Sequence, residues 1–250
     1  MIMNIVWLSA NKLGYELLKE AVKLKDVNIN AVITLSVESR IVMYDGIENH
    51  KWYEFGKKVY EIDKLNDKKD LVKRISPDLV IMCGWREVID KRVLGIPKYG
   101  FIGFHPTLLP IGRGPAPIIN SIMYGFVESG VTMYHVSGGL DDGDIVGQER
   151  YNILESDYAE DVYKKAIKAG RKLIKIYLPK IIKGSAPRIP QDNTKVLIFK
   201  KPELKNNQID LKKESVEEIY RKIRALSTPY KGAYIRKGGR KLIIWRAELE

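Results

Sequence analysis

Two short segments of the chain carry residue types that could perform acid–base chemistry. His105 ends the apolar run YGFIGFH, and the following PTLLPIGRG contains two prolines and two glycines, which predict a rigid, non-helical loop. The turn LDDGD at residues 140–144 places three carboxylates within four residues. Because ligands of open α/β sheets bind beyond the carboxyl ends of the strands, His105 is a candidate catalytic residue. Each segment also has a purely structural explanation, as a buried histidine and as an aspartate-rich turn.

The other patterns that signal reactive sites are missing from the sequence. The carboxylates at residues 141–144 lack the ligand spacing and the terminal glutamate of a calcium loop. Cys83 is the single cysteine of the chain, which leaves no intramolecular disulfide and no cysteine-based zinc site. Glycine-rich nucleotide motifs and the serine elbow of hydrolases are also absent. We therefore expect no bound metal, while the turn at residues 9–12 is a candidate phosphate site at a helix start.

The elements that would position these residues follow a repeated order of strand, turn and helix. An apolar run at residues 2–8 precedes apolar residues at helical spacing over residues 13–22, and a second run follows at residues 30–35. The runs at residues 78–83 and 99–105 predict further strands. Apolar strands without strict alternation, separated by helices, are typical of a parallel sheet covered on both faces. We predict an α/β fold with a doubly wound, mainly parallel, Rossmann-like sheet.

Beyond His105 the same pattern predicts the rest of this domain and a small appendage. One short helix, two strands and one long helix are expected at residues 117–123, 130–136, 144–153 and 157–183. Asp157 and Glu160 are predicted to cap the long helix, and Pro179 to bend it. The breaker-rich segment GSAPRIP predicts a linker, so we expect a core domain at residues 1–184 and a small C-terminal α+β subdomain at residues 185–250. In that subdomain we expect a strand, a helix and a hairpin, at residues 196–199, 216–226 and 234–245.

The charge of the chain favours anionic partners without choosing among them. The net charge is +12, of which residues 185–250 contribute +8, from 16 Lys and Arg against 8 Asp and Glu. Nucleic acid, a nucleotide diphosphate or a polyglutamate chain would suit such a surface, and so would a solvated lysine-rich face with no partner. The start of the sequence does not look like a leader, and no apolar stretch is long enough to span a bilayer. We therefore expect a soluble, cytoplasmic protein with no membrane partner.

Residues 100–146, GFIGFHPTLLPIGRGPAPIINSIMYGFVESGVTMYHVSGGLDDGDIV, carry several motifs at defined spacing. This segment closely resembles the core of the folate-dependent formyltransferases, the family of methionyl-tRNA formyltransferase, glycinamide ribonucleotide formyltransferase and the sugar N-formyltransferases. The family pattern runs Asn-x-His, Pro-Ser-Leu-Leu-Pro, Arg-Gly, Gly-Val-Thr and Leu-Asp-x-Gly-Asp. The match includes the 36-residue interval that places His105 and Asp141 on the catalytic positions. The resemblance continues through GWREVID at residues 84–90 and into the appendage, so it covers nearly the whole chain.

The resemblance implies attack of an unprotonated amine on the formyl carbon of N10-formyltetrahydrofolate, by way of a tetrahedral oxyanion. His105 would take a proton from the amine and help deliver one to the departing folate nitrogen, a role worth ~10² to 10⁴ in rate. Asp141 would orient the imidazole and stabilise its cationic form. N10-formyltetrahydrofolate is therefore the expected co-substrate.

One position departs from the family pattern. Where most members have asparagine two residues before the histidine, this chain has Gly103, which offers no side chain to the oxyanion. Since losing one oxyanion donor costs ~10² to 10³ in rate, we expect another donor to replace it. The candidates are Asn120, Thr107 and protonated His105 itself, of which we favour Asn120. Gly103 also leaves open a homologue that binds folate or a nucleotide without catalysing transfer.

The resemblance also assigns binding residues. Because pterin recognition in this family is largely by backbone groups, two loops are expected to flank the folate, formed by Trp85, Arg86, Glu87 and Val88 and by Ser137, Gly138, Gly139 and Leu140. The guanidinium group of an arginine can bind two phosphate oxygens at once. For the phosphate-bearing acceptor, the predicted residues are Asn11, Lys12, Thr107, Arg113 and Gly114. The long connection at residues 37–56 either covers the acceptor or packs over the sheet edge.

Length separates the possible acceptors. A tRNA formyltransferase usually has a complete C-terminal β-barrel, for which residues 185–250 are too few, and a purine-pathway enzyme would carry a glycine-rich loop where residues 9–12 have none. We therefore predict formylation of the amine of a nucleotide-linked deoxyamino sugar, for surface polysaccharide such as lipopolysaccharide. The runner-up is a methionyl-tRNA formyltransferase with a reduced C-terminal domain; a nucleic-acid partner is otherwise not expected. Apolar residues of the appendage, such as Leu242, Ile244 and Trp245, would suit either a dimer interface or the core, and we favour a homodimer.

Overall fold

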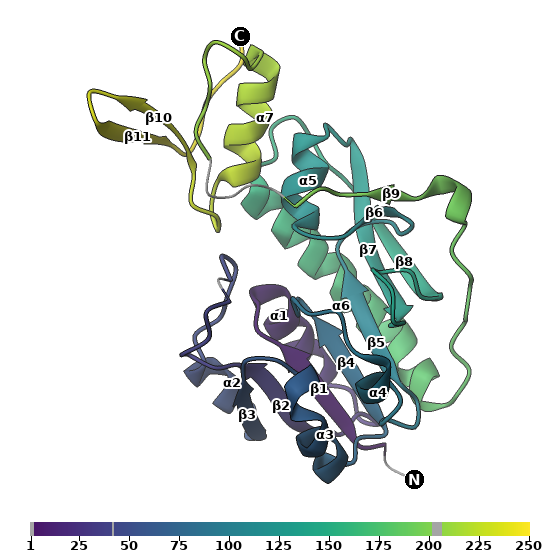
Figure 1. Cartoon of the computed structure of the whole chain (residues 1–250). Helices are drawn as coiled ribbons and strands as arrows, with labels where there is room; N and C mark the ends of the chain where they lie inside the picture. Colours follow the sequence, from purple (N-terminus) through teal and green to yellow (C-terminus); the bar gives the residue numbers. More distant parts are fainter. Residues whose placement is uncertain (1–2, 42, 202–206) are drawn as a thin grey trace.

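The computed structural model describes residues 3–41, 43–201 and 207–250, and in those residues a sheet of seven strands forms the centre of the chain (Figure 1). The strands are β1 (Ile5–Ser9), β2 (Ile29–Leu35), β3 (Lys58–Ile62), β4 (Leu79–Cys83), β5 (Phe101–His105), β7 (Glu128–His135) and β8 (Ile145–Asn152). Their order is β3-β2-β1-β4-β5-β7-β8. The first five of these run parallel, whereas β7 and β8 are antiparallel to their neighbours. The predicted mainly parallel α/β sheet is confirmed.

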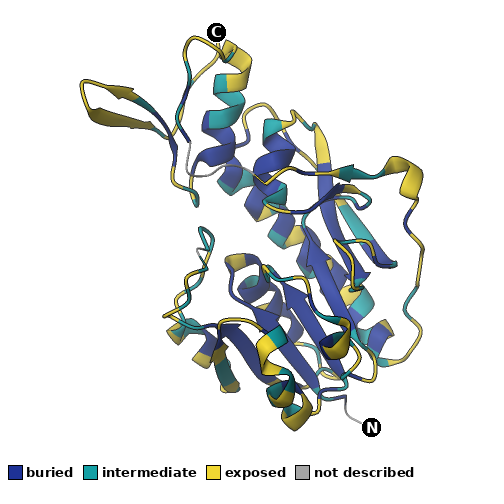
Figure 2. Cartoon of the chain, viewed as in Figure 1, coloured by how far each residue is buried: buried dark blue, intermediate teal, exposed yellow. Residues whose placement is uncertain are grey.

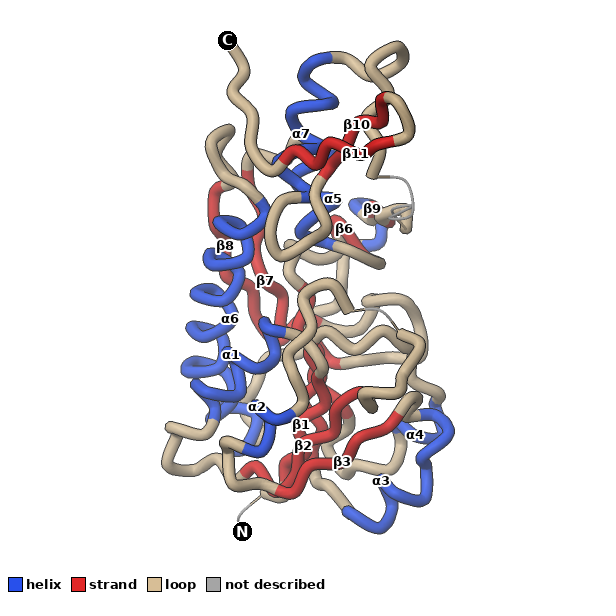
Figure 3. Tube along the Cα trace, turned by 90° about the vertical axis from the view of Figure 1, so that its left-hand side faces the viewer, coloured by secondary structure: helices blue, strands red, loops and turns tan. Residues whose placement is uncertain are grey.

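Helices cover both faces of the sheet (Figure 3). The helices are α1 (Lys12–Ala21), α2 (His50–Tyr53), α3 (Lys69–Ile75), α4 (Lys91–Leu94), α5 (Pro117–Met123), α6 (Ala159–Ile182) and α7 (Val216–Leu226), with short 3-10 turns at Asn66–Lys68 and Asn193–Lys195. In β1, Ile5 and Trp7 belong to the core under α1 and α6, while Val6 and Leu8 belong to the core under α3 and α4. Successive side chains of a strand point to opposite faces, so a fully apolar strand serves both cores. Figure 2 shows the central strands β1, β4 and β5 as buried along their length, whereas β3 is partly exposed.

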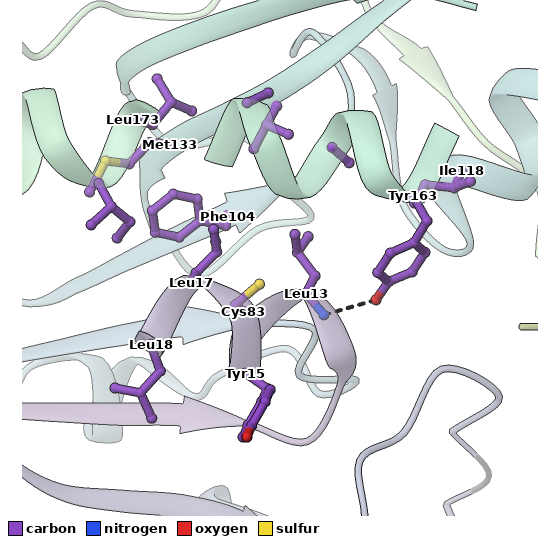
Figure 4. Packing of buried hydrophobic residues seen from close by; sticks show 14 of the residues in the cluster. Leu13, Tyr15, Leu17, Leu18, Cys83, Phe104, Ile118, Met133, Tyr163 and Leu173 are labelled. Atoms are coloured by element: carbon purple, nitrogen blue, oxygen red, sulfur yellow. Dashed lines mark hydrogen bonds between the residues drawn. The ribbon is translucent and has the colours of Figure 1, made fainter. Parts of the chain in front are cut away.

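The core between the sheet and α6 fixes the orientation of β5 (Figure 4). Phe104 of β5 and Met133 of β7 pack in one cluster with Leu173 of α6. At the start of α1, the backbone N–H of Leu13 donates to the hydroxyl of Tyr163, 3.0 Å away. Because Phe104 faces this core, its neighbours in β5 face the opposite side of the sheet.

Several element predictions need correction. The strand β3 was not predicted, because KVYEI is a partly exposed edge strand with charged residues at two of its five positions. The long helix α6 begins at Ala159 and its N-cap residue is Tyr158, whose backbone N–H donates to the Asp161 carboxylate over 3.1 Å, so Asp157 and Glu160 do not form its cap. Pro179 lies inside the helix, which continues to Ile182. The first predicted strand began at Ile2, which lies outside the described residues.

The C-terminal segment is connected to the core differently from the prediction. The strand β9 (Leu197–Ile198) pairs in parallel with β6 (Ile111–Arg113), in the loop that follows His105, instead of joining the appendage. The helix α7 packs against α5, and the hairpin of β10 (Ala233–Lys237) and β11 (Arg240–Ile244) projects from the molecule (Figure 1). The domain division at residue 184 stays a prediction. Among the described residues, no helix combines the length and the apolar character needed to cross a bilayer.

Candidate active site

His105 lies at the end of β5, on the face of the sheet that carries α3 and α4. Ile102 and Phe104 belong to the opposite core, so the alternation of the strand turns Gly103 and His105 to this side. The His105 side chain is buried, and its Nε2 atom lies 2.7 Å from the carbonyl oxygen of Gly112. Its Nδ1 atom lies 3.6 Å from Oδ2 of Asp141. An imidazolium at this position therefore has an oxygen acceptor beside each ring nitrogen.

Asp141 is held in the loop between β7 and β8 by two donors. The backbone N–H of Gly114 donates to Oδ2 over 2.9 Å, and the hydroxyl of Tyr134 donates to Oδ1 over 2.7 Å. The backbone of Asp141 has φ +49°, in the left-handed region that costs a non-glycine residue energy. A strained backbone at a residue that faces His105 is typical of functional sites. The sequence prediction that His105 and Asp141 meet thus agrees with the geometry.

Tyr134 is a site residue that the sequence analysis missed. It pairs with Gly103 in the antiparallel register of β5 and β7, and its ring lies directly over that glycine. A Cβ atom at position 103 would lie 2.6 Å from Cε1 of Tyr134, closer than carbon atoms approach. Knowledge of this strand register would have been needed to find Tyr134, because the two residues are far apart in the sequence.

The predicted oxyanion donor Asn120 is engaged elsewhere. Its amide nitrogen donates to the carbonyl oxygens of Pro115, at 2.8 Å, and Lys200, at 3.2 Å. These two bonds use both amide hydrogens, so Asn120 ties α5 to the segment after β9 rather than facing a reacting group. Thr107 is also buried, and its hydroxyl donates to the Gly112 carbonyl over 3.3 Å.

Arg113, predicted to bind acceptor phosphate, is instead a buried structural cation. Its Nε and Nη2 atoms donate to Oε1 of Gln191 over 3.0 and 2.8 Å, and Nη2 also donates to Asn193. The amide nitrogen of Gln191 donates in turn to the carbonyl oxygens of Asp141 and Gly143, both at 2.8 Å. Gln191, which the sequence analysis missed, therefore connects the loop after His105 with the loop of Asp141.

The predicted phosphate turn after β1 has its amide groups occupied by the protein itself. Asn11 caps α1 by accepting from the N–H of Gly14 over 2.9 Å, and the N–H of Lys12 donates to the carbonyl of Asp45 over 2.8 Å. The N–H of Leu13 is taken by Tyr163, as described above. Since a phosphate at a helix start needs these donors, the structure offers no open phosphate site at this turn. The Lys12 side chain is exposed.

The two loops predicted to bind folate lie near each other at α4. Glu87 orders the first loop, because its carboxylate accepts from the N–H of Leu65 at 2.7 Å and from the indole of Trp85 at 3.1 Å. In the second loop, Gly138 approaches the Lys91 side chain so closely that a Cβ would lie 3.0 Å from its Cε. Arg86, Val88, Gly139 and Leu140 are exposed around these contacts, while Ser137 bonds to the Asp142 carboxylate. The first loop follows β4, whose Cys83 pairs with Phe104 of β5, and the second loop directly precedes Asp141 in the sequence.

The comparison with family models decides the family. The model described as formyl transferase matches residues 3–177, and the model described as formyl transferase, C-terminal domain, matches residues 203–250. The chain belongs to the formyl transferase family. This confirms the resemblance on which the roles of His105 and Asp141 were assigned.

Relatives of this family member include enzymes with different acceptors in their names. Methionyl-tRNA formyltransferase of Halalkalibacterium halodurans is 34% identical over 192 residues, which cover 76% of this chain and 60% of that protein. The aligned part thus spans less than two thirds of the length of that relative. Among solved structures, a 4-N formyltransferase from Francisella tularensis matches with a TM-score of 0.79 at 24% identity, over 100% of this chain and 98% of that one. An N-formyltransferase from Helicobacter canadensis, in complex with folinic acid and dTDP-3-aminofucose, matches with a TM-score of 0.72 at 23% identity, over 97% and 87%.

Proposed function

We propose that this protein transfers a formyl group from N10-formyltetrahydrofolate to the amine of a nucleotide-linked deoxyamino sugar. The observation that carries this proposal is the pairing of His105 with Asp141, at 3.6 Å, beside two exposed loops. The His105 imidazole can take a proton from an attacking amine, and the Asp141 carboxylate stabilises the resulting cation. The carbonyl of Gly112 holds the other ring nitrogen, so the ring keeps one orientation while the proton moves.

The folate loops fit the donor by the nature of their exposed groups. Residues 85–88 follow β4, the parallel neighbour of β5, and residues 137–140 directly precede Asp141. The Glu87 carboxylate orders the first loop by accepting hydrogen bonds from Leu65, Asn66 and Trp85. N10-formyltetrahydrofolate, when bound, supplies the formyl carbon. The chain contributes the binding loops, the oriented imidazole and the carboxylate. The complex of the Helicobacter canadensis relative with folinic acid supports a folate donor here.

Two observations favour a sugar nucleotide as the acceptor. A solved sugar N-formyltransferase from Shewanella sp FDAARGOS_354 matches over 100% of this chain and 99% of its own, with a TM-score of 0.78 at 19% identity. The structural relative from Helicobacter canadensis is described with a nucleotide-linked amino sugar. The product would then be an N-formylated sugar for surface polysaccharide.

The tRNA reaction is the second candidate, and a specific observation favours it. Residues 185–250 carry a net charge of +8, and the hairpin of β10 and β11 exposes Arg240 and Lys241. Such a surface would attract the phosphates of tRNA.

Direct turnover tests the proposal. Purified protein is incubated with N10-formyltetrahydrofolate and either a panel of nucleotide-linked 3- and 4-amino sugars or methionyl-tRNA, and products are identified by mass. We expect one amino sugar to gain a formyl group and the charged tRNA to gain none. Formylation of tRNA alone, with affinity that falls steeply with salt as counterions are released, would establish the second candidate instead. Absence of turnover with every acceptor, together with retained folate binding, would indicate a non-catalytic binder.

The homodimer stays a prediction, and light scattering of the purified protein measures the oligomeric state.

A further inference from the structure

Position 103 and position 134 share one space in the sheet. Gly103 and Tyr134 are direct partners across β5 and β7, and the tyrosine ring fills the volume that a side chain at Gly103 would need. The Cζ and hydroxyl oxygen of Tyr134 would lie 2.7 and 3.0 Å from a Cβ at that position. The end of the Tyr134 ring therefore occupies the volume that a side chain at position 103 would fill.

The Tyr134 hydroxyl is a fixed donor in this position. The residue is 3% exposed, and its hydroxyl donates to Oδ1 of Asp141 over 2.7 Å. Burial, followed by the charge of Asp141, raises the pKa of Tyr134 well above its usual value, so the hydroxyl keeps its proton. Asp142 and Cys83 are the other titratable groups that act on Tyr134, and both push its pKa in the same direction.

We propose that Tyr134 is a positioning residue of the formyl-transfer site, which holds the Asp141 carboxylate toward His105 in place of a side chain at Gly103. This inference rests on the proposed function for its kinetic consequence. The carboxylate has two oxygens, and a different donor holds each one: Tyr134 on Oδ1 and the N–H of Gly114 on Oδ2. Two donors on two oxygens fix the rotation of the carboxyl plane, whereas either donor alone leaves that rotation free.

A core role for the ring and a positioning role for the hydroxyl can be separated. The ring packs over Gly103, and phenylalanine would fill the same volume. The hydroxyl reaches only Asp141 among the hydrogen bonds of the described residues. Tyr134→Phe therefore keeps the packing and removes the donor, which makes it the discriminating variant.

The first measurement needs no substrate. The chain has three histidines, so the NMR signals of the His105 imidazole can be assigned by substitution. In Tyr134→Phe we expect the ring signals of His105 to change position at neutral pH, because the tyrosine hydroxyl no longer holds the Asp141 carboxylate that faces this ring. Tyr151→Phe, which removes a hydroxyl from the neighbouring strand β8, is the matched control and should leave the His105 signals unchanged.

The second measurement is kinetic. Tyr134→Phe loses one hydrogen bond to the charged Asp141 carboxylate, so kcat should fall by about 10- to 100-fold while KM for the folate donor changes little. The thermal melting of both variants is recorded to show that they fold. If Tyr134→Phe leaves both the His105 ring signals and kcat unchanged, the inference is overturned. If the ring signals move but even the unmodified protein forms no formylated product, the proposed function fails and the coupling of Tyr134 to the His105–Asp141 pair stands.

Discussion

At the scale of single residues, the orientation of the His105 ring depends on contacts from two loops. The carbonyl of Gly112 holds Nε2 at 2.7 Å, and the Asp141 carboxylate faces Nδ1. Asp141 adopts a left-handed backbone to reach this place. A left-handed backbone costs a non-glycine residue conformational energy, and such residues concentrate at functional sites.

Asp141→Asn tests the carboxylate directly. The amide keeps the shape of the side chain but removes the negative charge that faces His105, so we expect kcat of formyl transfer to fall by ~10² to 10⁴. Asp144→Asn is the control, because Asp144 pairs with Arg188 rather than with His105. The measurement is kcat of both variants by steady-state kinetics. Equal kcat values for Asp141→Asn and Asp144→Asn would show that the charge of Asp141 has no part in formyl transfer.

A double-mutant cycle tests the shared space of Gly103 and Tyr134. Gly103→Asn alone overlaps the tyrosine ring, so we expect it to lower the free energy of unfolding by about 1 to 3 kcal/mol through overpacking. Combined with Tyr134→Ala, the new side chain has room, and the double variant should be more stable than the sum of the two single effects. Urea unfolding measures all three variants. Additive effects would mean that the two side chains do not compete for the same volume.

Among the predicted site residues, the two carried by a spaced motif lie close together in the structure. His105 and Asp141 match the family pattern and are neighbours in space, while their catalytic roles stay a prediction. Asn120 and Arg113 were assigned to ligands because their actual partners, Lys200 and Gln191, lie 80 and 78 residues away. No local pattern in the sequence encodes contacts of that range. Tyr134 was missed for the same reason.

At the scale of elements, residues 189–199 hold both loops of the site. Ile189 pairs with Ile145 of β8, and β9 pairs with β6, which lies in the loop that follows His105. Between these two pairings, Gln191 accepts from Arg113 and donates to the carbonyl of Asp141. The segment predicted to begin the appendage is therefore part of the support of the site.

Gln191→Ala measures this support. It removes the partner of Nε of the buried Arg113 guanidinium and the donor to two loop carbonyls, so we expect the free energy of unfolding to fall by about 1 to 3 kcal/mol and kcat to fall with it. Asn193→Ala removes a single 3.2 Å bond to the same guanidinium and should cost less. Denaturant unfolding compares the two, and a loss in Gln191→Ala no greater than in Asn193→Ala would contradict the supporting role.

Most regular elements could be predicted from the apolar pattern of the sequence. Buried strands such as β1, β4 and β5 contain continuous apolar runs, which this pattern detects. Short elements such as β3 and α2 contain no continuous apolar run, because charged residues interrupt β3 and α2 spans only four residues, so they give no comparable signal. The partner of β9 was not predictable either, since two residues of regular strand do not specify which edge they pair with.

At the scale of the whole molecule, buried tyrosines make stability depend on alkaline pH. Burial raises the pKa of Tyr134, Tyr163 and Tyr230 well above the usual value, and the Glu54 hydrogen bond raises the pKa of Tyr15 to about 12. In the unfolded chain these hydroxyls lose their protons near pH ~10, while the folded chain keeps them. Their contribution to stability is complete below that pH and is lost as pH rises toward their folded pKa values.

Unfolding experiments between pH 9 and 11 test this dependence. Above pH ~10, each of these tyrosines should lower the free energy of unfolding by about 1.4 kcal/mol per pH unit, since the unfolded state binds fewer protons. In Tyr163→Phe one such group is gone, so the slope should be shallower even though the variant is less stable at neutral pH. Urea midpoints measured across this range give both slopes, and identical slopes would show that Tyr163 ionises equally in both states.

The pairing of β9 with β6 has a consequence for how the molecule is made. When the first 184 residues have left the ribosome, His105, Asp141 and Tyr134 are already present. Residues 189–199, which connect the loops of the site, have not yet emerged. The site would therefore form only after residue 199 has emerged. A nascent or truncated chain would contain all three side chains without the segment that holds their loops together.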